Sequence, residues 1–182
     1  MMQHIRFMLF YPKIGPDMYL THWLLFFKPL RLMFCRHRLK SIGKNSEVRP
    51  FAVIDGTNNV SIADNVIIPG GVGLISDYTD TTAQIIIEDD VLFGPNAFVY
   101  STTHNFRDPS IPIKYQGCRN SPTKIKKGAW IGIGAIIMPG VTVGINSVVG
   151  ANSVVTKDVP DFSVVVGAPA RVIRTLSASI DT

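Results

Sequence analysis

Aliphatic residues recur every six positions through the second half of the chain. They occupy Ile125, Ile131, Ile137, Val143, Val149 and Val155, and a small or β-branched residue follows each of them four positions later. An amphipathic helix needs a period of 3.6 residues and a two-faced strand a period of two, so neither explains a period of six. The spacing is typical of a solenoid of short strands, in which one aliphatic side chain per strand points inward and a turn follows.

The same period extends upstream, where it is interrupted at regular places. Two, seven and twenty additional residues separate successive groups of three anchors, the last of them before Ile125. This grouping predicts eighteen-residue coils with three sides each, and every insertion should leave at the same corner of a triangular prism. Loops on one edge of a rigid scaffold often carry binding and catalytic residues. The three groups of anchors are Ile42, Val48 and Ile54, then Ile62, Ile68 and Leu74, then Ile87, Phe93 and Val99.

These patterns predict one principal domain with a short appendage and a short tail. The repeats cover residues 41–175, with loops at 75–86 and 101–123, and residues 176–182 form the C-terminal tail. Residues 1–40 form a basic and apolar appendage that we expect to be partly helical. With 182 residues, of which 46% are hydrophobic, the chain has enough apolar side chains for one substantial core.

Positive charge is concentrated at the N-terminus. The first fifty residues contain nine Lys or Arg against two acidic residues, a balance of +7, while the whole chain carries +5. The apolar run at 18–27 is too short to cross ~30 Å of hydrocarbon. Two interpretations remain open: a helix that covers the open end of the solenoid, or a basic amphipathic segment at an anionic membrane surface. No nucleic-acid-binding motif accompanies the charge, so no nucleic-acid partner is expected.

Two segments make the pattern specific. They are VLFGPNAFVYSTTHNFRDPSIPI and, after it, TKIKKGAWIGIGAIIMPGVTVGINSVVGANSVVTKDVPDFSVVVGAPARVIR. Both resemble the hexapeptide-repeat acyltransferases, and most of all the branch of galactoside, maltose and polysaccharide O-acetyltransferases. The resemblance covers roughly residues 42–175. It implies an all-β fold, a left-handed parallel β-helix, with a homotrimer as the active unit, acetyl-coenzyme A as the acyl donor and no requirement for a metal.

One of the four histidines stands out as a candidate general base. His104 follows the Val99 anchor by five residues, at the entrance to the longest insertion, and it matches the loop histidine of the family. Acyl transfer to a sugar hydroxyl requires removal of the hydroxyl proton, and imidazole titrates in the working range. His104 is expected to take this proton and to return it to the sulfur of coenzyme A. A backbone N–H near Gly132 or Ile133 is expected to stabilise the oxyanion.

Match to the family also assigns residues to the acyl donor. Some are expected to line the pantetheine tunnel and others to contact the nucleotide end. For Trp130, packing against a neighbouring subunit is an equal alternative, and for Lys157 and Arg174 the alternative is plain surface charge. The tunnel residues are Trp130, Gly132 and Ala151, and the nucleotide residues are Thr156, Lys157, Arg171 and Arg174.

The sequence thus predicts an acetyl-coenzyme A-dependent O-acetyltransferase that modifies a sugar hydroxyl during surface polysaccharide or glycan biosynthesis. Asp77, in the LISDYTD insertion, and Asn105, next to the candidate base, are expected to contact the acceptor. A drug acetyltransferase of the streptogramin or chloramphenicol type and an N-acetyltransferase for nucleotide-linked amino sugars are the enzymatic alternatives. A solenoid binding scaffold is the non-enzymatic alternative, and the single histidine of the repeat region argues against a zinc-dependent form of it.

The two cysteines and the N-terminal charge bear on where the protein works. Cys35 and Cys118 are isolated and lack the spacing of metal ligands, so we expect two reduced thiols in a cytoplasmic protein. The basic segment 1–40 could additionally hold the protein at the inner face of an anionic membrane, which would suit a lipid-linked acceptor.

Overall fold

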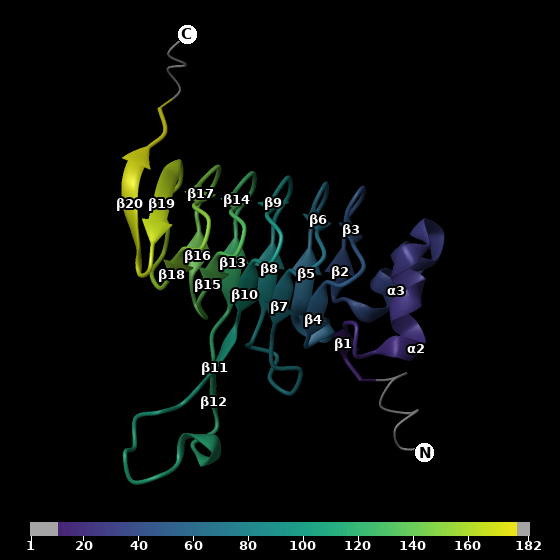
Figure 1. The fold of residues 1–182 in the computed structure, drawn as a ribbon, viewed down its shortest axis with the longest axis horizontal. Coiled ribbons are helices and arrows are strands. Elements are labelled where there is room, and N and C mark those ends of the chain that lie inside the picture. Colours follow the sequence, from purple (N-terminus) through teal and green to yellow (C-terminus); the bar gives the residue numbers. More distant parts are fainter. Residues whose placement is uncertain (1–10, 178–182) are drawn as a thin grey trace.

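The computed structural model describes residues 11–177, which form a three-sided parallel β-helix (Figure 1). Each coil contributes one short strand to each of three sheets that run along the molecule. Residues 1–10 and 178–182, which include most of the predicted tail and the first part of the predicted appendage, lie outside the described residues.

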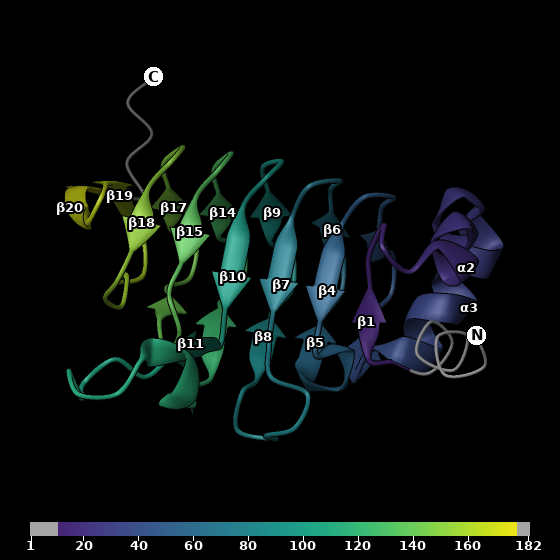
Figure 2. The ribbon, with the colours of Figure 1, turned by 60° about the horizontal axis from the view of Figure 1, so that its bottom comes forward.

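The three sheets, here called A, B and C, are visited in the same order in every coil, from B to C to A (Figure 2). Sheet B contains β2 (Ser41–Ile42), β5 (Val60–Ile62), β8 (Ile85–Ile87), β13 (Thr123–Ile125) and β16 (Thr142–Val143). Sheet C contains β3 (Glu47–Val48), β6 (Ile67–Ile68), β9 (Leu92–Phe93), β14 (Trp130–Ile131), β17 (Val148–Val149) and β19 (Ser163–Gly167), and β20 (Ala170–Thr175) pairs antiparallel with β19. Sheet A contains β4 (Val53–Asp55), β7 (Gly73–Ile75), β10 (Phe98–Tyr100), β15 (Ile136–Ile137) and β18 (Val154–Val155), and β1 (Lys13–Ile14) pairs antiparallel with β4.

The anchors of the six-residue repeat are the inward side chains of these strands. Parallel pairing brings each anchor directly against the anchor one coil away, so the apolar side chains stack into a continuous core. Burial of such side chains is the main favourable contribution to stability in a repeat fold of this kind. The predicted grouping of anchors in threes is confirmed, including Leu74. In sheet A the stacked residues are Ile54, Leu74, Val99, Ile137 and Val155.

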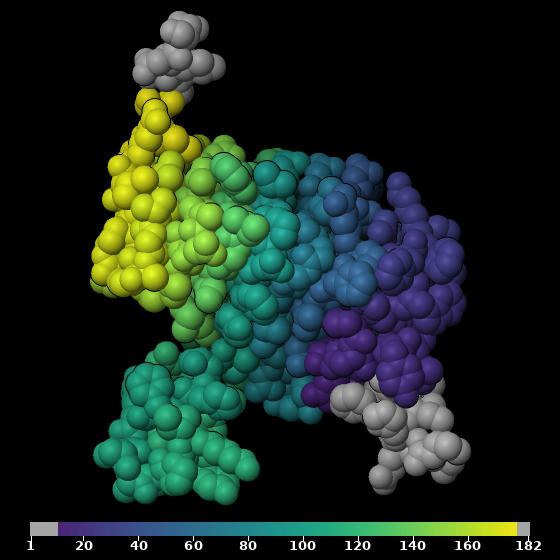
Figure 3. Space-filling view, viewed as in Figure 1, coloured from purple at the N-terminus to yellow at the C-terminus, as the bar shows by residue number. Residues whose placement is uncertain are grey.

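All three insertions leave at the corner between sheets A and B, as the spacing predicts. The first holds η2 (Thr57–Asn59), and the second is the loop between β7 and β8. The third contains β11 (Thr102–His104), η3 (Ile113–Tyr115) and β12 (Cys118–Asn120), and the pair β11–β12 forms an antiparallel hairpin. This hairpin stands away from the body of the prism (Figure 3). We call this corner the loop edge.

The other corners are closed by residues that tolerate left-handed backbone conformations. Gly128 has a φ of 70°, and a Cβ at this position would lie 2.0 Å from Oδ1 of Asn146 in the next coil. Glycine adopts this conformation without strain and leaves room for the Asn146 side chain. On the same corner the side chain of Asn45 donates to Asn65 at 3.2 Å, and that of Asn65 donates to Asp90 at 2.8 Å. A ladder of side chains therefore links successive coils.

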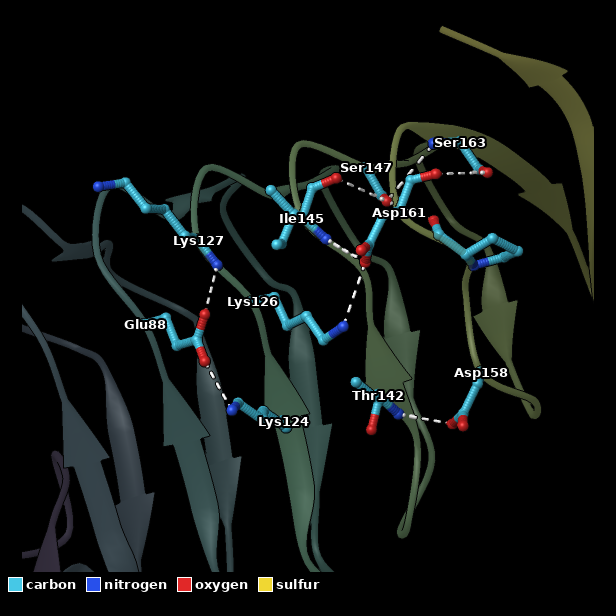
Figure 4. Close-up of polar contacts among 11 residues, drawn as sticks. Glu88, Lys124, Lys126, Lys127, Thr142, Ile145, Ser147, Asp158, Asp161 and Ser163 are labelled. Atoms are coloured by element: carbon cyan, nitrogen blue, oxygen red, sulfur yellow. Dashed lines mark hydrogen bonds and ion pairs between the residues drawn. The ribbon is translucent and has the colours of Figure 1, made fainter.

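The outward side chains give the three sides different characters. Sheet B is polar, and ion pairs such as Lys124–Glu88 at 2.6 Å and Lys126–Asp161 at 3.2 Å follow it (Figure 4). Sheets A and C instead present mostly apolar side chains to the outside, and a charged exception on sheet C is Glu47, which pairs with Arg31 and Arg49. The apolar side chains are Val53, Phe98, Ile136 and Val154 on sheet A, and Ile67, Leu92, Trp130, Val148 and Val164 on sheet C.

The described part of the N-terminal segment covers the first coil. It contains α2 (Tyr19–His22), η1 (Trp23–Phe26) and α3 (Lys28–Arg38), and α3 lies across the end of the prism (Figure 1). Cys35 of α3 is fully buried, and this burial raises the pKa of its thiol to about 12. The segment therefore caps the solenoid, as the first of the two interpretations expects. Its buried apolar residues are Ile14, Met18, Leu25, Phe34, Cys35 and Leu39.

The outer surface of this cap remains apolar. The Trp23 and Phe27 rings lie 6.0 Å apart, and the Phe26 ring lies 5.9 Å from Phe51 of the first coil. Among the described residues no helix is both long enough and apolar enough to cross a bilayer. The exposed residues of this surface, which we call the aromatic patch, are Tyr19, Leu20, Trp23, Phe26, Phe27 and Phe51.

Candidate active site

The β11–β12 hairpin presents His104 beside a cavity of about 330 Å³ at the loop edge. His104 is the last residue of β11, and its side chain is exposed. Cys118 lies directly opposite on β12, with Sγ 3.6 Å from Nδ1 of the imidazole. The remaining lining residues are Ile75, Tyr100, Thr102, Thr103, Met138 and Pro139. An exposed imidazole at the rim of a largely apolar cavity has the arrangement that a general base requires.

Asn105 stabilises the hairpin rather than projecting freely into the cavity. Its backbone N–H donates to the carbonyl of Gly117 at 3.0 Å. Its side-chain amide donates to the carbonyls of Gln116 at 3.2 Å and Cys118 at 3.3 Å. These bonds fix the position of His104, the residue before it. The amide oxygen of Asn105 makes no hydrogen bond within the described residues.

Asp77 belongs to a network that joins the loop at 75–86 to the hairpin. Its carboxylate accepts hydrogen bonds from the N–H and the hydroxyl of Thr79 and from the side chain of Asn120, at 2.8, 2.6 and 3.1 Å. Asn120 also donates to Asp80 at 2.9 Å. The bonds from Thr79, and then that from Asn120, hold the pKa of Asp77 below its usual range, and Asn120 does the same for Asp80. Both carboxylates are therefore ionised at neutral pH.

Two of the residues predicted to bind acetyl-coenzyme A lie on the same edge as His104. The turn after β15 brings Met138 and Pro139 to the cavity one coil beyond the hairpin. Met138 donates its N–H to the carbonyl of Val155 at 3.0 Å, so the turn after β18 is stacked on it. That turn carries Thr156 and Lys157, both exposed. The loop edge thus offers a continuous track from His104 to Lys157.

Trp130, Gly132 and Ala151 lie elsewhere on the prism. Trp130 projects from the outer face of sheet C and is 49% exposed. Gly132 follows it at the corner between sheets C and A, where a Cβ would lie 2.7 Å from the backbone nitrogen of Ala151 in the next coil. Gly132 and Ala151 are therefore tightly packed on each other in successive coils, and this close packing step requires glycine at position 132.

The backbone N–H groups of Gly132 and Ile133, near this step, differ in whether they already donate a hydrogen bond. The N–H of Gly132 donates to the carbonyl of Val149 at 2.8 Å and is part of the sheet ladder. The N–H of Ile133, in contrast, makes no hydrogen bond within the described residues, and Ile133 is half exposed. Of the two expected oxyanion donors, only the Ile133 N–H can bind a new acceptor without breaking a ladder bond.

Arg171 and Arg174 lie on β20, at the C-terminal end of sheet C. Arg174 pairs with Val164 and Arg171 with Val166 of β19. Both arginines are exposed, and neither makes an ion pair within the described residues. Two guanidinium groups therefore remain able to bind phosphate, which guanidinium groups recognise well.

One chain therefore divides the predicted site residues between separate regions. His104, Asp77, Asn105, Thr156 and Lys157 share the loop edge. The remaining residues are on sheet C or at the corner between sheets C and A, and in a triangular prism the loop edge lies opposite sheet C. These residues are Trp130, Gly132, Ala151, Arg171 and Arg174.

The contributors to the loop edge that were not identified from the sequence include Cys118, Asn120 and Met138. Met138 follows an anchor, so the repeat itself contained a signal for its position at the loop edge. Cys118 and Asn120 lie inside an insertion without periodicity. Among the residues that the structure describes, no group of three or more His, Cys, Asp or Glu is arranged to hold a metal ion.

Comparison with known proteins identifies relatives of this architecture. Residues 122–157 match the family described as bacterial transferase hexapeptide (six repeats). The chain is 35% identical over 142 residues to galactoside O-acetyltransferase of Escherichia coli K12, a match that covers 75% of this chain and 64% of that enzyme. The chain thus spans just under two thirds of the length of this curated relative.

Two solved structures match over a larger share of their length. A galactoside acetyltransferase in complex with coenzyme A superposes with a TM-score of 0.74 at 31% identity, covering 85% of this chain and 78% of that one. A hexapeptide-repeat acetyltransferase of Vibrio cholerae in complex with acetyl-coenzyme A gives a TM-score of 0.73 at 32% identity, covering 82% and 78%. The expected left-handed parallel β-helix is thereby confirmed.

Proposed function

The chain belongs to the hexapeptide-repeat acetyltransferases, and from this premise we propose that it transfers an acetyl group from acetyl-coenzyme A to a carbohydrate hydroxyl. The observation that carries this proposal is the exposed imidazole of His104 at the rim of the 330 Å³ cavity on the loop edge. Relatives named as galactoside and maltose O-acetyltransferases support a sugar as the acceptor class.

His104 acts as the general base in this proposal. A sugar hydroxyl is a weak nucleophile near neutral pH, so its proton must be removed as its oxygen attacks the thioester carbonyl. The imidazole takes that proton, and the carbonyl oxygen becomes an oxyanion. When the tetrahedral intermediate collapses, the C–S bond breaks and the imidazolium returns the proton to the sulfur of coenzyme A. The acetyl ester and free coenzyme A are the products.

The Ile133 N–H is the proposed oxyanion donor. It is the donor near Gly132 that makes no hydrogen bond within the described residues, and the isoleucine side chain cannot itself donate. A positioned backbone N–H is a common way to stabilise such an oxygen. Because Ile133 is at the corner between sheets C and A, it can approach His104 only when it belongs to a neighbouring subunit.

Acetyl-coenzyme A, the acyl donor, lies along the loop edge in this proposal. The track from His104 past Met138 to Thr156 crosses two coils, or about 10 Å at the usual spacing of paired strands. Lys157 lies at the far end of this track and Arg174 on sheet C, and both are exposed cations. Phosphate groups require such partners. We therefore retain Lys157, Arg171 and Arg174 as the residues that contact the nucleotide end.

We further propose a homotrimer in which neighbouring chains complete each site. The outer faces of sheets A and C are mostly apolar, whereas that of sheet B is mostly polar and carries the ion pairs of Figure 4. An apolar outer face is favoured at a subunit interface and a charged one in solvent. A contact in which the loop edge of one chain meets the corner between sheets C and A of the next is heterologous, and it closes as a ring when a three-fold axis relates the chains. This arrangement brings Trp130, Gly132 and Ala151 toward the loop edge of a neighbour.

The acceptor is bound between the hairpin and the loop at 75–86. Asp77 already accepts three hydrogen bonds, but an ionised carboxylate has about four acceptor positions and can accept one more from a sugar hydroxyl. Asn105 offers its amide oxygen in the same way. Both residues combine a structural role with the proposed contact to the sugar.

We also propose a cytoplasmic location in which the cap touches the inner face of an anionic membrane. The aromatic patch is exposed, and most of it belongs to an N-terminal segment that also has excess positive charge. A cavity of about 390 Å³ lies between α3 and the first coil; its lining includes the cations Lys28 and Arg36, the ion pair of Arg31 with Glu47, and the apolar residues Leu32 and Val48. Apolar rings flanked by cations suit an interface of acyl chains and phosphate groups. A lipid-linked glycan would then be the natural acceptor.

The proposed reaction is tested by an acceptor screen. The protein is incubated with acetyl-coenzyme A and, in separate wells, with simple sugars, glycan intermediates, amino sugars and antibiotics, while release of free thiol is followed. Thiol release with hydroxylated sugars and formation of an acetyl ester supports the proposal. Thiol release only with amino sugars or antibiotics would reject it in favour of N-acetylation or drug modification.

A further inference from the structure

We propose that Cys118 is a positioning residue for His104, whose thiol holds the imidazole by Nδ1 so that Nε2 is the nitrogen that takes the proton. This inference rests on the proposed role of His104 as the general base. It assigns a task to a cysteine that neither the sequence pattern nor the proposed reaction uses.

The geometry that supports this role is the register of the hairpin. β11 and β12 pair antiparallel, and His104 lies directly opposite Cys118. Opposite residues of an antiparallel pair have their side chains on the same face of the ribbon. Sγ lies 3.6 Å from Nδ1, and both side chains line the cavity of about 330 Å³. Within the described residues this is the only hydrogen-bonding contact of the imidazole.

The chemistry of the two groups explains what such a contact does. A neutral imidazole carries its proton on one nitrogen, and the other nitrogen is the base. When Nδ1–H donates to the sulfur, Nε2 keeps its lone pair and can accept the proton of a hydroxyl. After transfer both nitrogens carry protons, and the contact from Nδ1–H to sulfur helps to stabilise the imidazolium. The thiol keeps its own proton throughout and forms no covalent bond.

The surroundings of Cys118 hold its thiol in place. The Cys118 carbonyl accepts the side-chain amide of Asn105 at 3.3 Å. Two residues further along β12, Asn120 donates to the carboxylates of Asp77 at 3.1 Å and Asp80 at 2.9 Å. The loop at 75–86 therefore anchors the strand that carries the thiol, and it supports the base through Cys118 rather than by direct contact with the imidazole.

The same distance would also suit a thiolate that attacks the thioester, and the two roles have different consequences. A nucleophilic Cys118 would form an acetyl-thioester with release of coenzyme A before any acceptor binds. It would also consume the base, because the imidazole would hold the thiol proton. The positioning role instead leaves the thiol unmodified during turnover. The experiment therefore includes a measurement of acetylated protein.

The test compares four variants with the wild-type enzyme, using methyl galactoside or maltose as acceptor and water as the acceptor if neither sugar reacts. Cys118→Ala removes the sulfur, and Cys118→Ser replaces it with another acceptor for Nδ1–H. Arg119→Ala is the matched control, since its side chain is exposed and points to the other face of the ribbon. His104→Ala reports on the base itself. The measurements are kcat, KM for acetyl-coenzyme A, the pH dependence of kcat/KM, and the mass of the protein after incubation with acetyl-coenzyme A alone.

The expected result has three parts. Cys118→Ala lowers kcat by ~3–10-fold, the effect of losing one hydrogen bond, and leaves KM for acetyl-coenzyme A unchanged. The acidic limb of its pH profile moves to lower pH, because the imidazolium is less well stabilised, and a merely structural role would not cause this shift. Cys118→Ser and Arg119→Ala keep the profile of the wild-type enzyme.

The results that would contradict the positioning role can be distinguished from those that would contradict the proposed function. Wild-type kcat and pH profile in Cys118→Ala, together with an inactive His104→Ala, would reject the positioning role and leave the proposed function intact. Full activity of His104→Ala would remove the base and this inference with it. An acetyl group on Cys118, together with loss of activity in Cys118→Ser, would replace positioning by covalent catalysis.

Discussion

Trp130 and His104 lie on opposite sides of the prism within one chain. The indole of Trp130 projects from the outer face of sheet C, and His104 lies on the hairpin that leaves at the opposite corner, between sheets A and B. If both residues serve the same reaction, they come from different chains. The packing of the subunits therefore determines whether the residues predicted to bind acetyl-coenzyme A can act together with His104.

A mixing experiment tests whether each site is shared between chains. His104→Ala and Trp130→Ala subunits, each impaired alone, are coexpressed in equal amounts, and activity is measured per trimer. In a ring where His104 of one chain meets Trp130 of the next, about one quarter of the sites are wild type in both residues. Activity should therefore recover to about that fraction, and light scattering should give about three times 20.0 kDa. Absence of recovery in mixed trimers, or a fully active monomer, would contradict the shared site.

The general base is tested by His104→Ala. This change should lower kcat by ~10²–10⁴-fold, the usual contribution of general base catalysis. Affinity for acetyl-coenzyme A and the oligomeric state should stay the same, because the side chain is exposed and packs no core. His37→Ala, at an exposed position of α3, is the matched control. Wild-type turnover of His104→Ala at saturating substrate would exclude His104 from the mechanism.

The nucleotide end of the donor is tested with two acetylated donors. The double variant Lys157→Ala/Arg174→Ala should raise KM for acetyl-coenzyme A by ~10-fold or more, since each cation can form a charge-assisted hydrogen bond to phosphate. KM for acetyl-dephospho-coenzyme A should change much less, because that donor lacks the additional phosphate. Lys124→Ala is the control, since Lys124 is paired with Glu88 on the polar side. Equal weakening of both donors would show that these residues do not recognise that phosphate.

The fold was readable from the sequence because each strand contributes one inward side chain at a fixed spacing. This spacing correctly located the coils, the loop edge and even Leu74. The hairpin was not readable in the same way. The pairing of His104 with Cys118 depends on the course of residues 105–117, which join β11 to β12, and no period marks that course.

The N-terminal cap shows the same limit for a different reason. Its apolar run predicted a helix, but the run changes from α2 to a 3₁₀ turn at Trp23. The change in residues per turn alters which side chains point inward. As a result Leu25 is buried while Phe26 and Phe27 are exposed. A uniform helical period could not have predicted this division.

The polar side of the prism makes a pH-dependent contribution to stability. Glu88 accepts hydrogen bonds from Nζ of Lys124 at 2.6 Å and from the N–H of Lys127 at 2.9 Å, and the Lys124 bond above all lowers the pKa of Glu88 (Figure 4). A carboxyl whose pKa is lower in the folded state stabilises the fold above its unfolded pKa of about 4.3, and this stabilisation is lost as the pH falls through the folded pKa.

Glu88→Gln should therefore reduce the free energy of unfolding by ~0.5 kcal/mol at pH 7, the size expected of a partly exposed ion pair. The difference from the wild-type protein should shrink from about pH 5 downward and disappear at lower pH. Urea denaturation at several pH values measures it. A difference that stays constant down to pH 3 would show that the effect does not arise from the charge.

The aromatic patch predicts binding of the cap to anionic membranes. Insertion of exposed rings is favourable at the interface between acyl chains and head groups, and nearby cations add about 1 kcal/mol each on an anionic surface. Lys28, Arg36 and Lys40 are exposed around α3, so several such contributions combine. Screening by salt weakens them, because the Debye length falls to about 3 Å at 1 M salt. The full-length protein should thus bind anionic vesicles at low salt, release them at high salt and ignore neutral vesicles.

The contribution of the rings is separated from that of the charges by substitution. Trp23→Ser/Phe27→Ser should weaken binding to anionic vesicles at every salt concentration, since it removes two adjacent rings without changing the charge. Tyr115→Ser removes an even more exposed ring on the 101–123 loop, far along the chain from the cap, and should leave vesicle binding unchanged. Flotation of the proteins with the vesicles measures both. If the full-length protein fails to float with anionic vesicles even at low salt, the segment serves only as a cap, and the argument for a lipid-linked acceptor loses its structural support.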